Sequence, residues 1–203
     1  MDERFQHPFT CVVAEPTSCG KTEFVAKFIR HVKQMTTPSP QRIVWCYGEW
    51  QRRFYSVPNV EFIEGLPQRE NFYGTQSTLL ILDDLMNETN RSVTDLFTKG
   101  GHHRNLSVVY IVQNLFNNGK DRTISLNSHY IVVFKNPCDA SQIVHLAKQA
   151  YPGKVKAVQE AFKDATSSPF GYLMLDFKQC RPDKLRLRTK VLPDETTVVY
   201  VLC

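Results

Sequence analysis

The chain has 203 residues, of which 42% are hydrophobic and 22% are charged, a composition that excludes intrinsic disorder and allows one large domain. Its 25 Lys and Arg exceed its 20 Asp and Glu, and the formal net charge of +5 suits a polyanionic partner without requiring one. Its six cysteines form no C-x-x-C pair, which argues against a zinc site or a dense disulfide framework and favours a reducing compartment.

Short apolar runs alternate with amphipathic stretches, a pattern that predicts an α/β fold with a mainly parallel sheet covered by helices. The first strand is expected at Phe9–Ala14, and a helix follows it because Phe24, Phe28 and Val32 recur at helical spacing. Further strands are expected at Arg42–Cys46, Val60–Ile63, Thr78–Leu82, Ser107–Val112 and His129–Phe134, and further helices at Val93–Thr98, Ala140–Ala150 and Val155–Ala165.

The C-terminal part of the chain changes character, because helical periodicity gives way to three short β-rich runs. Pro169–Phe177, Lys184–Val191 and Thr197–Leu202 are expected to form an appended meander. No long linker occurs, so residues 1–203 are predicted to form one domain with a core at 9–151 and a C-terminal β extension at 169–203. The absence of an apolar leader and of an apolar run near about 18 residues favours an intracellular protein without a membrane span.

The stretch AEPTSCGKT lies between the first strand and its helix and ends like a phosphate-binding loop. In that setting Lys21 reaches the β and γ phosphates of a nucleotide, the Thr22 hydroxyl ligates Mg²⁺, and the helix N-terminus faces the anion. The predicted nucleotide-binding residues are Pro16, Thr17, Ser18, Cys19, Gly20, Lys21 and Thr22.

Glu15 occupies the position where the G-x-x-x-x-G-K-[ST] pattern has its first glycine. Either its carboxylate turns outward and the site works, or it stays inward and repels phosphate. We expect a weakened site, because Pro16 fixes its own φ and biases Glu15 toward an extended conformation. Replacement of Glu15 by glycine is then expected to tighten ATP binding at least tenfold, equivalent to about 1.4 kcal/mol.

The run TLLILDDLM delivers two carboxylates to the end of a buried strand, the form of a Walker B element. The first, Asp83, is assigned to the magnesium ion together with Thr22. The second, Asp84, is assigned to the attacking water as its general base. The two residues thus complete the predicted hydrolytic site.

A third polar strand end occurs in SVVYIVQN, where Gln113 follows an apolar run. A strand between the two Walker strands would place Gln113 near the γ phosphate, where it senses hydrolysis and helps to position water. The preceding GGHHRN tip offers Arg104 as an arginine finger for a neighbouring subunit, and Arg122 is the second candidate.

Together, PTSCGKT, LLILDDLM, HHRN followed by SVVYIVQNLF, and RTISLNSHYIVVFKNP resemble the genome-packaging ATPases of the poxvirus type, including those of Polinton (Maverick) elements, virophages and large DNA viruses. The resemblance covers about residues 9 to 151. It implies a RecA-like P-loop fold of the ASCE class, in the FtsK/HerA branch, and an oligomeric ring that drives double-stranded DNA into a capsid using ATP and Mg²⁺. By matching position it supports the roles of Lys21, Thr22, Asp83, Asp84 and Gln113, and also Arg104.

Two other functional classes stay open at this point. A nucleotide kinase would also use a phosphate-binding loop, although no lid with several arginines can be located. A non-catalytic DNA-binding or scaffolding module is favoured by Glu15 and by the stretch KLRLRTK. As a strand, that stretch would present Lys184, Arg186, Arg188 and Lys190 on one face, either toward DNA phosphates or as a charged edge that prevents aggregation.

Overall fold

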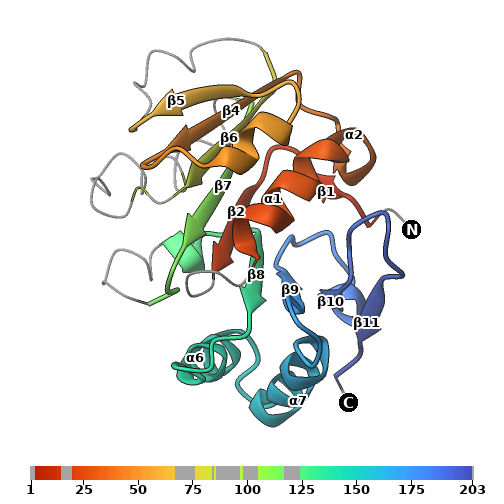
Figure 1. The fold of residues 1–203 in the computed structure, drawn as a ribbon. Coiled ribbons are helices and arrows are strands. Elements are labelled where there is room, and N and C mark those ends of the chain that lie inside the picture. Colours follow the sequence, from red (N-terminus) through yellow and green to blue (C-terminus); the bar gives the residue numbers. More distant parts are fainter. Residues whose placement is uncertain are drawn as a thin grey trace.

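The structure is a computed structural model that describes residues 3–14, 20–66, 76–83, 85, 97, 105–116 and 124–202. Within these residues one large sheet has the strand order β11-β10-β9-β8-β2-β7-β6-β4-β5 (Figure 1). Its strands are β2 (Thr10–Ala14), β4 (Arg42–Tyr47), β5 (Glu61–Glu64), β6 (Thr78–Asp83), β7 (Leu106–Val112), β8 (Tyr130–Phe134), β9 (Tyr172–Asp176), β10 (Leu187–Thr189) and β11 (Val198–Tyr200).

The sheet has a parallel part and an antiparallel part. The strands from β8 through β2, β7, β6 and β4 to β5 are all parallel to their neighbours. Beyond β8, the pairs β8·β9, β9·β10 and β10·β11 are antiparallel. The predicted C-terminal meander is therefore confirmed, and it extends the same sheet on the β8 side of β2.

Helices pack on both faces of the sheet, because the buried strands are apolar on both sides. The helices are α1 (Lys21–Arg30), α2 (Val32–Met35), α6 (Ser141–Ala150) and α7 (Val155–Ala165). Along β2, Val12 and Ala14 join the core cluster that contains α6 and α7 residues. Cys11 and Val13 join the opposite cluster, which contains α1 and α2 residues. None of the helices in the described part of the chain is long and apolar enough to cross a membrane.

A second, two-stranded parallel sheet lies beside the large one and was not predicted from the sequence. It pairs β1 (Phe5–Gln6) with β3 (Thr36–Thr37). Strands of two residues carry no periodic signal, so their pairing depends on tertiary contacts. Phe5 provides one such contact, since its ring centroid lies 4.5 Å from that of Tyr130 in β8 and 5.0 Å from that of Phe28 in α1.

Most predicted elements are confirmed within a residue or two, but two of the C-terminal ones are shorter than expected. The strand predicted from Pro169 begins only at Tyr172, because the residues before it form a turn in which Phe170 has φ 61°. The strand predicted at 184–191 is reduced to β10, preceded by the short helix η5 (Asp183–Leu185). Another short helix, η1 (Arg52–Ser56), precedes β5. The helix predicted at 93–98 lies outside the described residues except for Phe97, which is buried.

Candidate functional site

Gly20 joins the end of the predicted phosphate loop to helix α1. It adopts φ 115° in the left-handed region, where a side chain would be strained, and its carbonyl accepts the backbone N–H of Phe24 at 2.7 Å. The helix therefore begins at Lys21, as the sequence predicted. Thr22 is buried on the first turn, with 6% of its surface exposed.

The ends of three parallel strands bring the other predicted residues to the same edge of the sheet. Strand β7 lies between β2 and β6, which confirms the predicted order. Ala14 at the end of β2 pairs with Val112, and Asp83 at the end of β6 pairs with Ile111. Asp83 is 2% exposed, whereas Gln113 is exposed just beyond β7. Ligands of open α/β sheets bind at this carboxyl edge.

The turn after β7 is tethered to helix α6. The backbone N–H of Leu115 donates to the side-chain Oε1 of Gln142 at 3.1 Å, and Gln142 is buried on α6. The backbone N–H of Phe116 donates to Asn114 Oδ1 at 2.8 Å. These bonds fix the path of the chain that carries Gln113.

One cavity of about 1010 Å³ gathers these residues. Its lining from the three predicted motifs consists of Gly20, Lys21, Thr22, Asp83 and Gln113. A hydroxyl and a carboxylate that line one cavity are oxygen donors of the kind that Mg²⁺ prefers, so Thr22 and Asp83 fit the predicted metal role. The volume is at the upper end of the range for small-molecule sites, roughly 300–1,000 Å³.

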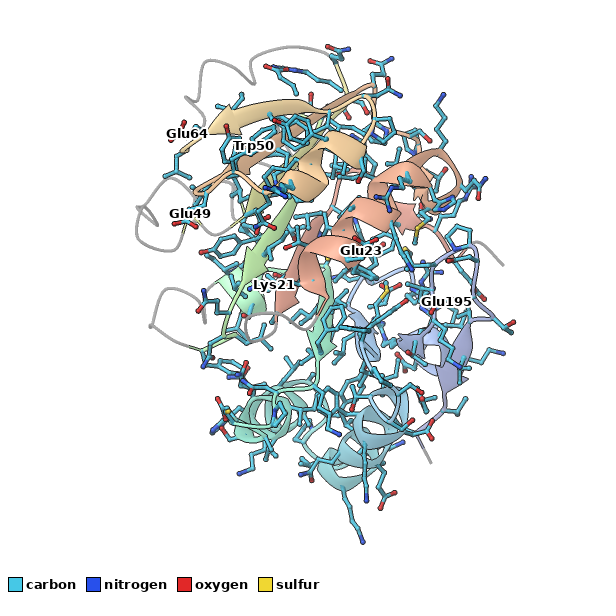
Figure 2. All side chains as sticks on the ribbon, in the orientation of Figure 1. Lys21, Glu23, Glu49, Trp50, Glu64 and Glu195 are labelled. Carbon is cyan, nitrogen blue, oxygen red and sulfur yellow. The ribbon has the colours of Figure 1, made fainter. Side chains whose placement is uncertain are left out.

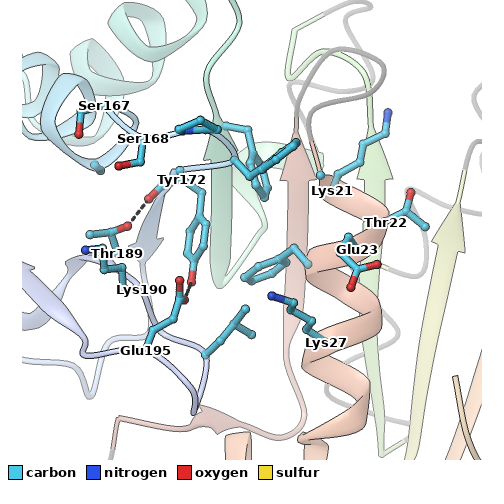
Figure 3. Close-up of a pocket in the computed structure, with 18 of the residues that line it drawn as sticks. Lys21, Thr22, Glu23, Lys27, Ser167, Ser168, Tyr172, Thr189, Lys190 and Glu195 are labelled. Atoms are coloured by element: carbon cyan, nitrogen blue, oxygen red, sulfur yellow. Dashed lines mark hydrogen bonds between the residues drawn. The ribbon is translucent and has the colours of Figure 1, made fainter. Parts of the chain in front are cut away.

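The opposite wall of the cavity comes from the C-terminal part of the chain (Figure 3). The figure shows Lys21, Thr22, Glu23 and Lys27 on α1, and across the cavity Ser167, Ser168, Tyr172, Thr189, Lys190 and Glu195. In Figure 2, Lys21 and Glu23 lie between Glu195 on the C-terminal side and Glu49, Trp50 and Glu64 near β5. Sequence reasoning missed this wall, although the Ser-Ser-Pro-Phe-Gly run at 167–171 carries the turn signals that could have located it.

Tyr172 and Glu195 are held together on this C-terminal wall. The Tyr172 hydroxyl donates to Glu195 Oε2 at 3.2 Å and accepts the backbone N–H of Val191 at 2.8 Å. Burial raises the pKa of Tyr172 well above its ordinary value, and the Glu195 carboxylate raises it further. The phenol therefore stays protonated and fixes the chain that follows β10 against β9.

Several predicted residues lie outside the described residues. They are Glu15, Pro16, Thr17, Ser18, Cys19, Asp84, Arg104 and Arg122. Their assigned roles stay predictions.

The expected basic face of KLRLRTK is wrong. Arg188 is buried and donates to Asp176, and Arg186 pairs with Asp183. Lys190 lines the cavity, and Lys184 lies on η5. The edge-strand alternative is also wrong, because β10 is flanked by β9 and β11. Of the four basic residues, Arg188 is buried in an interior ion pair, Arg186 is half-buried, and Lys184 and Lys190 are exposed, so they do not share one face.

No protein-family model matches the sequence, and no curated protein sequence matches it either. Solved structures of similar fold do exist. The crystal structure of B204, the DNA-packaging ATPase from Sulfolobus turreted icosahedral virus, matches with a TM-score of 0.58 at 9% identity, over 97% of this chain and 99% of that chain. The genome-packaging NTPase B204 from Sulfolobus turreted icosahedral virus 2, in complex with ATP-γS, matches with a TM-score of 0.57 at 12% identity, over 96% and 98%.

The chain has the α/β RecA-like fold of P-loop ATPases. At the level of fold, the likeness to viral genome-packaging ATPases that the motifs indicated is confirmed. At identities of 9% and 12% the likeness extends to the arrangement of the elements and not to individual side chains. The chemistry of the site therefore has to be argued from the residues that line the cavity.

Proposed function

We propose that this chain is an ATPase that binds ATP with Mg²⁺ and acts as a genome-packaging motor, moving double-stranded viral or transposon DNA into a capsid. The observation that carries the proposal is the meeting of three separate motifs, represented by Lys21, Asp83 and Gln113, in one cavity. Support also comes from the B204 structures, one of which is in complex with ATP-γS and another with AMPPCP.

In this proposal the chain's own residues act on the triphosphate. Lys21 and the N-terminus of α1 bind the phosphates and stabilise the charge that develops on them. Thr22 and Asp83 would hold Mg²⁺, which when bound neutralises phosphate charge. Asp84 orients and deprotonates the attacking water, and Gln113 senses the γ phosphate.

The wider arrangement belongs to the same proposal. We place residues 9–151 and the extension 169–203 in a single ATPase domain that assembles into a homo-oligomeric ring in the host cytoplasm or nucleus. Arg104 or Arg122 of a neighbouring subunit would complete each ATP site. Capsid components would bind the ring. An arginine supplied in this way contributes a large factor in rate because it neutralises transition-state charge.

The test is phosphate release from Mg-ATP by the purified chain, with and without double-stranded DNA. Lys21→Ala is expected to lower kcat by about 100-fold or more, because a preorganised charge at the phosphates is lost. Lys33→Ala removes an exposed lysine from α2 and serves as the matched control, with unchanged turnover expected. DNA binding without any nucleotide binding would instead support a scaffolding module, and phosphate transfer to a small acceptor would support a kinase.

A further inference from the structure

The C-terminal wall of the cavity lies on one side of strand β2, and Asp83 and Gln113 lie on the other. Asp83 ends β6 and Gln113 follows β7, whereas the C-terminal wall comes from β9–β11 and the turn that leads into β9, beyond β8 on the opposite side of β2. A ligand whose terminal phosphate lies between Asp83 and Gln113 therefore extends toward the C-terminal wall. That wall supplies most of the remaining lining of the cavity.

Phe170 is the residue of this wall that lies nearest to the space beside Gly20. A Cβ placed on Gly20 would lie 3.2 Å from Phe170 Cδ1, so the ring occupies the space beside the loop's glycine although the two residues are far apart in sequence. The Phe170 side chain is nevertheless 68% exposed and lines the cavity. A large apolar ring beside a phosphate loop, covered by little of the protein, presents a flat surface to a ligand.

The backbone holds Phe170 in place at a conformational cost. Phe170 has φ 61°, a left-handed conformation that a bulky residue seldom adopts. The turn is closed by Gly171, whose N–H donates to Ser168 O at 3.1 Å and whose Cα has no room for a side chain, since a Cβ would lie 2.4 Å from Ala165 O. The strain is therefore built into a turn that aims an exposed aromatic ring at the cavity.

We propose that the ring of Phe170 stacks on the base of the bound nucleotide, which makes the C-terminal wall the nucleoside subsite. The inference rests on the proposed function, because it takes the phosphate end of the cavity to hold a triphosphate. Stacking uses the π face that every base has, and it gives affinity without reading a hydrogen-bonding pattern. The subsite thus favours nucleoside triphosphates over bare polyphosphate, and Phe170 supplies that preference.

The experiment compares two ligands by calorimetric titration in the presence of Mg²⁺: ATP, and inorganic tripolyphosphate, which lacks a base. Phe170→Gly is the main variant, because it removes the ring while suiting the left-handed backbone, so its Tm should not fall. It should weaken ATP binding by about tenfold or more and leave tripolyphosphate binding unchanged. Phe170→Tyr keeps the ring and should bind ATP like the wild type.

A matched control removes another exposed aromatic side chain. Tyr55 is 81% exposed on η1 and does not line the cavity, so Tyr55→Ala should leave both affinities unchanged. Equal ATP affinity in the wild type and Phe170→Gly would overturn the stacking proposal while leaving the ATPase proposal intact. Equal losses for ATP and tripolyphosphate would also overturn it, since Phe170 would then support the phosphate loop. A wild-type chain that binds neither ligand would overturn both proposals.

Discussion

Arg188 and Asp176 form a buried ion pair across neighbouring strands of the C-terminal extension. The Arg188 guanidinium donates to Asp176 Oδ2 at 2.7 Å, and their side chains are 1% and 0% exposed. Arg181 donates to the same oxygen, also at 2.7 Å. Buried charges persist only where they are paired and hydrogen-bonded, so the removal of one partner at the junction of β9 and β10 leaves an uncompensated charge in the interior.

Arg188→Ala should destabilise the protein strongly, because it leaves the buried Asp176 carboxylate with one cation fewer. The expected loss in the free energy of unfolding is about 3–5 kcal/mol, measured by urea denaturation. Lys184→Ala, at an exposed position on η5, is the control and should change stability by less than about 0.5 kcal/mol. Similar losses in the two variants would mean that the buried Asp176 carboxylate does not require Arg188.

The buried His7 predicts a loss of stability in mild acid. Its Nε2–H donates to Asn105 Oδ1 at 2.9 Å, and Ser107 bonds its Nδ1, an arrangement that suits the neutral ring. Burial lowers the pKa of His7 from its ordinary value near 6.5. The contribution of neutral His7 to the free energy of unfolding is therefore complete above about pH 6.5. It is lost as the pH falls from there through the lowered pKa of the folded state, because the unfolded chain takes up the proton first.

The measurement is the free energy of unfolding of the wild type and of His7→Gln between pH 7 and pH 5. A single proton changes this free energy by at most about 1.4 kcal/mol per pH unit. As the pH is lowered, the free energy of unfolding of the wild type should fall more steeply than that of His7→Gln. The difference in slope should be a fraction of about 1.4 kcal/mol per pH unit. Parallel curves would show that His7 does not titrate differently in the folded and unfolded states.

Substitution by alanine should have different effects on stability at two glycines near helix α7. At Gly171 a methyl group would lie 2.4 Å from Ala165 O, so Gly171→Ala should cost about 1–3 kcal/mol of stability and disturb the turn that carries Phe170. At Gly153 the new methyl group would meet nothing within 4 Å, so Gly153→Ala should be neutral or stabilise by up to about 1 kcal/mol. Thermal denaturation of the two variants and of the wild type measures the difference. Equal shifts in Tm for the two variants would contradict the prediction.

Gln142 should position the turn that carries Gln113. Gln142→Leu removes the acceptor for the buried Leu115 N–H and should cost about 1–3 kcal/mol of stability. If the proposed function holds, kcat for ATP hydrolysis should fall while the dissociation constant of ATP changes little. The reason is that the substitution disturbs only the part of the site that contacts the γ phosphate. Gln149→Leu, on the exposed face of α6, is the control for both readouts. A changed dissociation constant with normal kcat would contradict the positioning role.

Local pattern alone determined the parallel core of this protein. Apolar runs such as TLLIL and SVVYIV are short and, in the second case, rich in β-branched residues, which favours strands buried on both faces. The change from loop to helix at Gly20 and Lys21 is likewise a local backbone signal. The order in which β7 lies between β2 and β6 was expected from the family resemblance and not from local pattern, because it depends on pairing between strands far apart in sequence. The strands and the start of the helix need only interactions between residues close in sequence and the burial of apolar surface.

Tertiary structure decided the features that depend on residues far apart in sequence. The alternation in KLRLRTK suggested a basic face, yet Arg188 is interior because Asp176 lies on the neighbouring strand to receive it. Phe170 had no recognisable role in the sequence, since only the folded chain brings its ring against Gly20. Side-chain spacing predicts which face of an element a residue occupies, but the partner on that face is set by how the strands pair.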